Sequence, residues 1–282
     1  ILTETGINIF LIQQKDDIRK YFSSAWIVSI VRGCLIALVL ILSAPIVVNF
    51  FHSPESYSVI ILIAFVPFIK GFINPGIIKI QKEIEFQKEF YMRLILFIVD
   101  ATVAIVVAFI TKSAESFAYG LIASAVLEVI FSFVFFKPFP NLSFDLEKVK
   151  LIIRRGWWVT LTGIFSYTAE NGDNIFVGRM LNISSLGIYQ IAYKFSTLPI
   201  SEITNVVNKV VFPVYSKFSE DKDRLWNAFV KVLATSSILA VLLGAFIFIF
   251  AEQIINALLG SMWMEAVPIV KILAFYGILR TI

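Results

Sequence analysis

The chain of 282 residues is 59% hydrophobic and 15% aromatic, whereas charged residues make up only 16% of it. A soluble protein is about half apolar and a quarter charged, so this composition excludes an ordinary water-soluble fold and predicts a chain that faces lipid. One cysteine and one histidine exclude a disulfide framework and any metal site built on those residues. The net charge of +4 is interpreted as basic loops on one membrane face, with no nucleic-acid partner.

Apolar stretches of roughly 20 residues, long enough to cross about 30 Å of hydrocarbon, recur along the chain. They predict membrane-spanning helices at Trp26–Phe51, Val59–Ile80, Leu94–Ile110, Phe117–Phe136, Trp157–Leu181, Leu186–Phe212, Val230–Phe250 and Val267–Ile282. The opening run ILTETGINIFLI has the character of the end of an earlier span, and the sequence stops inside an apolar helix. We therefore expect an all-α, polytopic membrane protein, of which this chain is a fragment truncated at both ends.

Positive charge alternates between successive connections. Fifteen Lys and Arg residues fall on one side, and only Lys112 and Arg179 fall on the other. Because basic residues are retained on the cytoplasmic face, the richer side is predicted to be cytoplasmic, in the inner membrane. The connector NLSFDLEKVKLIIRRG mixes apolar and basic residues. It is predicted to form a short amphipathic helix on the cytoplasmic surface, between two helical bundles.

An internal repeat supports the division into two bundles. The run APIVVNFF at 44–51, followed by VIILIAF at 59–65, matches AEQIINAL at 251–258, followed by IVKILAF at 269–275. Six predicted helices separate the two copies, so both copies point the same way. This pattern predicts a parallel repeat about an axis along the membrane normal, a layout known in transporters.

Ionisable side chains are unusually frequent within the predicted spans. Each costs at least about 2.5–3.5 kcal/mol on insertion scales, so such side chains usually face a bundle interior or a water-filled cavity. They are Arg32, Lys70, Asp100, Glu128, Glu170, Asp173, Lys194 and Glu202. Their number predicts an aqueous vestibule and argues against a scaffold that transports nothing.

The segment YTAENGDN is the most polar part of any predicted span. Glu170 and Asp173 are three residues apart and therefore share a helix face. Asp173 and Lys194 lie at similar depths on either side of a turn. Either the two form an inert pair that locks two helices, or they form a site for a coupling ion or proton beside a cationic substrate contact.

Lys70 lies between Pro67 and Pro75 in a stretch that also contains two glycines. These residues predict a broken helix, and a cation near the middle of the membrane suits an anion in transit. The alternative is a simple kink with Lys70 snorkelling to an interface. Arg32 is about two turns from the cytoplasmic end of its span, so it is either a cavity cation or a snorkelling side chain.

Asp100 and Glu128 lie near mid-depth in consecutive predicted spans. They either hydrogen-bond to each other or titrate, and packing is the preferred interpretation of Glu128. The sequence contains no GxxxxGK[ST], GxSxG or HExxH motif. These absences argue against an ATP-driven pump and against the hydrolases that carry such motifs.

Three segments together resemble a known family. The opening GINIFLIQQKDD resembles a signature in the second helix of polysaccharide export proteins of the multidrug/oligosaccharidyl-lipid/polysaccharide superfamily. The run INPGIIKIQKEIEFQKEF resembles that family's basic turn. The run NGDNIFVGRMLNISSLGIYQIAYKFSTLPI, followed by VVFPVYSKFSED, resembles its seventh and eighth helices. The resemblance covers essentially the whole chain.

The resemblance implies the fold of multidrug exporters, with two six-helix lobes and a first helix that starts in the cytoplasm. The lobes correspond here to residues 1–136 and 157–282, each incomplete, joined by the connector 137–156. The implied activity is flipping of an undecaprenyl-diphosphate-linked oligosaccharide or a related polysaccharide precursor, such as an O-antigen unit of lipopolysaccharide. Membrane lipids, and polymerases or glycosyltransferases of polysaccharide assembly, are the implied partners. No enzymatic activity and no cofactor are implied.

For that activity, Arg32, Lys70 and Lys194 are predicted to contact the diphosphate or an acidic sugar. A further set, Glu170, Asp173 and Asp100, is predicted to couple transport to protons or sodium ions. One alternative is a cation-coupled multidrug antiporter of the same fold, which needs a net acidic cavity and tolerates loss of the lysines. The other is a membrane enzyme of polysaccharide assembly, which needs an indispensable acid, base or nucleophile near a loop.

Overall fold

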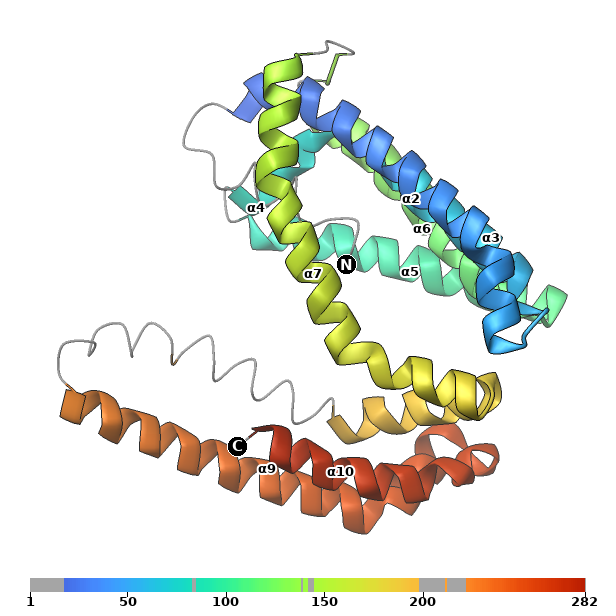
Figure 1. Ribbon diagram of the computed structural model, residues 1–282, viewed down its shortest axis with the longest axis vertical. Coiled ribbons are helices and arrows are strands. Elements are labelled where there is room, and N and C mark those ends of the chain that lie inside the picture. The colour runs from blue at the N-terminus through green and yellow to red at the C-terminus, as the bar shows by residue number, and fades with distance from the viewer. Residues whose placement is uncertain are drawn as a thin grey trace. The chain divides into compact units, whose positions relative to one another are not determined.

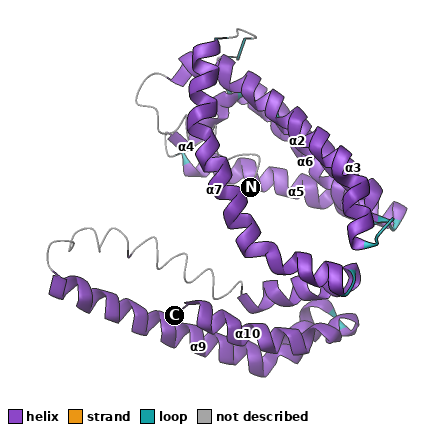
Figure 2. Cartoon of the chain, viewed as in Figure 1, coloured by secondary structure: helices purple, strands orange, loops and turns teal. Residues whose placement is uncertain are grey.

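The computed structural model of the protein describes residues 18–82, 85–137, 139–141, 145–197, 211 and 222–281 (Figure 1). Every regular element within these ranges is a helix, as Figure 2 shows, which confirms the predicted all-α class. In chain order the elements are η1 (Ile18–Tyr21), α2 (Phe22–Phe51), α3 (Ser56–Lys70), η2 (Pro75–Ile77), α4 (Ile78–Lys82), α5 (Phe86–Thr111), α6 (Glu115–Phe135), α7 (Leu146–Met180), a helical segment at 183–197, α9 (Lys222–Leu259), η3 (Ser261–Ala266) and α10 (Val267–Thr281). The predicted signature at 6–17 and Glu202 lie outside the described residues.

Five helices among the described residues are long and apolar enough to cross a membrane. They are Phe22–Phe51, Gln87–Thr111, Glu115–Phe135, Lys222–Leu259 and Ser261–Arg280. A shorter apolar helix spans Ser56–Lys70. These helices agree with the predicted polytopic membrane protein.

The chain divides into two compact units, Ile1–Gly172 and Asp173–Ile282. Helix α7 runs without a break from Leu146 to Met180, so the predicted surface helix and the predicted span after it form one helix. Its first turns are anchored by Ile152, which is buried in a cluster with Ala25 of α2 and Ile78 of α4. The lobe boundaries at 136 and 157 stay a prediction.

In the first unit, α2 packs on α3, α3 packs on α6, and α6 packs on α5. The α2–α3 contact is close because Gly33 has no side chain. A Cβ atom added there would lie 2.5 Å from the carbonyl oxygen of Pro67 and 3.2 Å from the Cα atom of Gly71. This close approach brings Arg32, which precedes Gly33, and Lys70, which precedes Gly71, toward the same space.

Replacing Gly33 by alanine is expected to force α2 and α3 apart and to lower the free energy of unfolding by about 1–3 kcal/mol, because the new methyl group meets rigid backbone. Thermal unfolding of the purified protein in detergent measures the effect. Gly163→Ala is the matched control, since no atom lies within 4 Å of a Cβ added at Gly163. Equal stability of the two variants would contradict this account of the α2–α3 contact.

The chain leaves α3 at a break that the sequence predicts. Helix α3 ends at Lys70, and a short 3-10 helix begins only at Pro75. The fully buried Asn74 fixes the turn. Its side-chain oxygen accepts a hydrogen bond from Gly76 N at 2.9 Å, and its backbone N–H donates to Ser132 Oγ of α6 at 2.9 Å. The break is therefore held in one geometry by α6.

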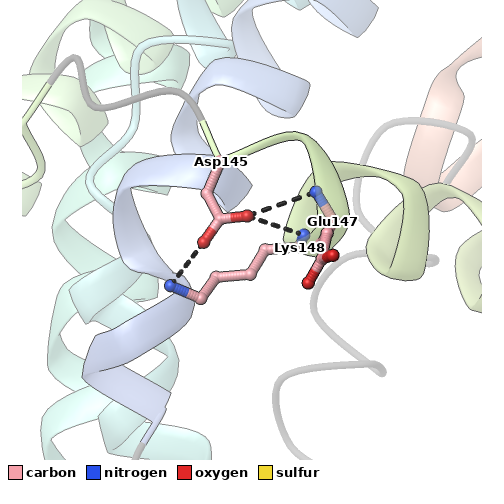
Figure 3. Close-up of polar contacts among 3 residues, drawn as sticks. All are labelled: Asp145, Glu147 and Lys148. Carbon is pink, nitrogen blue, oxygen red and sulfur yellow. Dashed lines mark hydrogen bonds and ion pairs between the residues drawn. The ribbon is translucent and has the colours of Figure 1, made fainter.

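Helix α7 begins with an N-terminal cap, shown in Figure 3. Asp145 Oδ1 accepts hydrogen bonds from the backbone N–H groups of Glu147 and Lys148, at 3.2 and 3.3 Å. Asp145 Oδ2 lies 2.8 Å from Lys148 Nζ. The hydrogen bond from the Lys148 side chain, followed by the one from its backbone, lowers the pKa of Asp145 below its ordinary value of 3.8. The carboxylate form therefore stabilises the first turn of α7.

Because the pKa of Asp145 is depressed in the folded state, the cap is fully present above 3.8 and is lost as the pH falls through the lower folded-state pKa. Acidification is expected to lower the protection of the Glu147 and Lys148 amides against hydrogen–deuterium exchange, measured relative to the intrinsic exchange rate at each pH. Asp145→Ala is expected to show fast exchange already at neutral pH, whereas Glu147→Gln keeps the acid dependence. Amide protection in Asp145→Ala that still rises between acid and neutral pH would contradict the assignment.

In the second unit, α9 and α10 form a hairpin joined by η3. Its core is built from small and branched apolar residues, including Ala251, Ile255 and Val270. Here Gly244 makes the closest approach, because a Cβ added there would collide with the side chain of Ile278.

Candidate cation-lined cavity

A cavity of about 280 Å³ lies in the first unit, lined by α2, α3, η2, α4, α5 and α6. Its charged lining residues are Arg32, Lys70, Glu89, Arg93 and Glu128. Among the described residues, three cations and two carboxylates give this lining a net charge of +1. The cavity therefore attracts an anion more strongly than a cation.

Lys70 is the centre of this site. Its Nζ atom lies 2.9 Å from Glu128 Oε2, and the two side chains are 28% and 13% exposed. Helix α3 has 15 residues, a length of about 22 Å, which is shorter than the roughly 30 Å of a bilayer's hydrocarbon. A helix of this length that starts at the membrane surface ends within the hydrocarbon, which is the depth we expect for Lys70 in its last turn. The partial negative charge of the helix C-terminus stabilises its ammonium group.

A second charged pair lies across the cavity on α5. Arg93 donates from Nε to Glu89 Oε1 at 2.9 Å, and its Nη2 atom lies 2.8 Å from the same oxygen. Arg32 enters the lining from α2, next to Gly33. The cations thus come from three different helices, and each faces the same space.

Two of the three predicted substrate contacts, Arg32 and Lys70, line this one cavity. The structure pairs Lys70 with Glu128, which opposes the alternative of snorkelling to an interface. Glu128 forms an ion pair with Lys70, a contact that the sequence did not predict, and among the described residues no hydrogen bond joins it to Asp100. Its interpretation as a packing residue stays a prediction. Asp100 is not among the lining residues and lies against α6, where a Cβ added at Gly120 would be 2.5 Å from its Oδ1 atom.

The remaining predicted residues lie on α7 and on the segment 183–197. Asp173 Oδ2 accepts a hydrogen bond from Tyr189 Oη at 2.5 Å. Among the described residues no ion pair joins Asp173 to Lys194, which is exposed, as is Glu170. The expected Asp173–Lys194 pair is therefore replaced by an acid–tyrosine hydrogen bond.

One turn after Tyr189, Tyr193 accepts a hydrogen bond from Arg280 Nη1 at 2.7 Å, and the rings of the two tyrosines are 6.2 Å apart. Sequence reasoning assigned no role to these tyrosines or to Arg280. The available signal was the four-residue spacing of Tyr189 and Tyr193, which places both phenols on one helix face.

Comparison with known proteins identifies a family whose profile matches most of the chain. The profile of the family described as "Polysaccharide biosynthesis protein" matches residues 1–268. The chain is 24% identical to the teichuronic acid biosynthesis protein TuaB of Bacillus subtilis, over 100% of the chain and 59% of that protein. It is also 24% identical to the lipopolysaccharide biosynthesis protein WzxC of Escherichia coli, over 100% of the chain and 58% of that protein.

The succinoglycan biosynthesis transport protein ExoT of Rhizobium meliloti is 22% identical, over 94% of the chain and 53% of that protein. The chain thus spans less than three fifths of the length of each of these three relatives. No solved structure matches it significantly. The profile match covers 268 of the 282 residues. The chain therefore belongs to the polysaccharide biosynthesis protein family.

Proposed function

We propose that the protein is a flippase that moves an undecaprenyl-diphosphate-linked oligosaccharide, or a related polysaccharide precursor, from the inner to the outer leaflet of the cytoplasmic membrane. The observation that carries this proposal is the net positive cavity formed by Arg32, Lys70 and Arg93 with two carboxylates. A lipid diphosphate is anionic, and phosphate oxygens form strong charge-assisted hydrogen bonds with Lys and Arg. A multidrug exporter for organic cations needs the opposite sign of charge in its cavity.

The size of the cavity indicates which part of the substrate it would hold. Ligand pockets generally have volumes of about 300–1,000 Å³, and this one, at about 280 Å³, lies just below that range. It suits a phosphate-bearing headgroup and is too small for a whole oligosaccharide. In this account, the sugars occupy space outside the described cavity.

Glu128 competes with the substrate for Lys70, because the two side chains form an ion pair. Without substrate, the carboxylate compensates the ammonium charge at 2.9 Å. A diphosphate oxygen that binds Lys70 displaces Glu128, which then turns to Arg32 or to water in the same cavity. The exchange keeps Lys70 compensated in both states, so the protein does not carry an isolated charge through the membrane interior.

The energy for directional movement comes, in this proposal, from a proton or sodium ion. Asp173 and Glu170 are the proposed coupling acids, with Asp100 a third, and Lys194 is a proposed further substrate contact. An ion bound at these acids favours one arrangement of the protein, and substrate bound at the cations favours the other. The protein relocates its substrate and makes or breaks no covalent bond. Membrane lipids surround it, and polymerases or glycosyltransferases of polysaccharide assembly are the proposed partners.

Equilibrium binding of ligands to the purified full-length gene product tests the sign of the net charge in the cavity. We expect it to bind undecaprenyl-diphosphate-linked oligosaccharide and to release it with rising salt, because the contact is electrostatic. A fluorescent organic cation such as ethidium is the comparison ligand and is expected to bind at least about tenfold more weakly. Tight ethidium binding that lipid diphosphate does not displace would favour the multidrug exporter.

A further inference from the structure

The internal repeat extends further along the chain than the two apolar runs that reveal it. Continuing the second half of the alignment at its offset of 210 residues matches AFVPFIKG at 64–71 with AFYGILRT at 274–281. The added positions, 66–71 and 276–281, place Lys70 opposite Arg280. Each copy therefore carries one basic residue at the same position.

The structure shows that equivalent positions of the two copies are buried in the same way. The hairpin α2–α3 and the hairpin α9–α10 each bury an alanine completely in the first helix, Ala44 and Ala251, and another in the second, Ala64 and Ala274. These two pairs are equivalent in the alignment.

The close contact between the two helices also recurs in each hairpin. In the first copy, Gly33 meets the backbone at Pro67, and in the second copy Gly244 meets Ile278. Gly244 is equivalent to Ala37, one helical turn from Gly33. In both hairpins a glycine thus sets the spacing of the two helices, at positions one helical turn apart in the alignment. Lys70 and Arg280 lie on the second helix of their hairpins, α3 and α10, at equivalent positions of the alignment.

The two cations differ in their immediate partners. Lys70 is compensated by the carboxylate of Glu128 at 2.9 Å. Arg280 is exposed and donates to the neutral phenol of Tyr193 at 2.7 Å, and among the described residues no carboxylate forms an ion pair with it. The hydrogen bond orients the guanidinium group without neutralising it. A guanidinium presents five N–H donors in a planar fork that matches phosphate oxygens.

We propose that Arg280 is a second contact for the phosphate groups of the transported lipid, in the second unit, equivalent to Lys70 in the first. Tyr193 is its positioning residue. The inference rests on the proposed function, because it takes its ligand class from there. It adds a binding residue that neither the predicted site nor the cavity of the first unit contains.

Binding of a fluorescent polyprenyl diphosphate to the purified full-length gene product tests this assignment, with uncharged polyprenol as the comparison ligand. Arg280→Gln is expected to weaken diphosphate binding at least about tenfold, as loss of a charge-assisted contact does. Arg280→Lys is expected to retain most of the affinity, and neither variant is expected to change polyprenol binding. Tyr193→Phe is expected to weaken diphosphate binding less than Arg280→Gln, while polyprenol binding stays unchanged.

Lys271→Gln is the matched control. Lys271 is a basic residue of the same helix, with its Nζ atom 5.8 Å from the centre of the Phe248 ring, but its equivalent in the first copy is Ile61. We expect this variant to bind diphosphate as the wild type does. Arg280→Gln that binds diphosphate normally, while Lys70→Gln binds it weakly, would overturn the assignment of Arg280 alone. A wild-type protein that fails to bind diphosphate would overturn the proposed function as well.

Discussion

Lys70→Gln is expected to slow flipping of a lipid-linked oligosaccharide at least about tenfold, because the substitution removes the cation at the end of α3 that the diphosphate would contact. The single variant also leaves Glu128 as an uncompensated carboxylate, with its side chain only 13% exposed. A loss of folding would therefore imitate a loss of function in this variant.

The double variant Lys70→Gln/Glu128→Gln separates the two effects. It removes both charges and retains two amides that can hydrogen-bond across the same gap. We expect its thermal unfolding to be close to that of the wild type and its flipping to be as slow as that of Lys70→Gln. Measurement of both properties on one preparation is decisive, and normal flipping by the double variant would contradict the role of Lys70.

Asp173→Asn is expected to abolish the response of flipping to an imposed proton or sodium gradient. An amide retains an oxygen that accepts the hydrogen bond from Tyr189, now 2.5 Å long, but it has no charge with which to bind either cation. Flipping under a gradient should then fall to the rate measured without one, while diphosphate binding stays normal.

The control for Asp173→Asn is Glu252→Gln, which neutralises an exposed carboxylate on α9. This variant should respond to the gradient as the wild type does. Rates are measured in proteoliposomes with the gradient applied in each direction. A full gradient response in Asp173→Asn would contradict the assignment of Asp173 as the coupling acid. Glu170, the proposed acid nearest to it, would then be the next to substitute.

Five of the predicted spans are readable from the sequence because lipid imposes a simple length and composition on them. The predicted span Trp157–Leu181 falls in α7, which is not among the described helices that are apolar enough to cross a membrane. The break at Lys70 is also readable, since Pro67 and Pro75 interrupt an apolar run and α3 does end at Lys70. The uninterrupted α7 was not predicted. Its basic residues indicated a separate surface helix, whereas burial of Ile152 against Ala25 and Ile78 fixes the first turns of the same long helix.

The composition of the cavity was only partly predictable. Charge within a span marks Arg32 and Lys70 as candidates, but their convergence depends on the close α2–α3 contact at Gly33. The pairing of Lys70 with Glu128 depends on how far α6 is rotated relative to α3, and hydropathy carries no information on that rotation. For the same reason Asp173 was assigned to Lys194, whereas Tyr189 donates a hydrogen bond to its Oδ2 atom.

In the proposed function, the cations of the first unit bind an anionic lipid headgroup as it crosses the membrane. The most direct measurement follows a fluorescent undecaprenyl-diphosphate-linked oligosaccharide in proteoliposomes and records how fast its sugar becomes accessible in the opposite leaflet. The account predicts movement faster than in protein-free liposomes, slowed about tenfold or more by Lys70→Gln/Glu128→Gln. Movement no faster than in protein-free liposomes, or equally fast in the double variant, would contradict it.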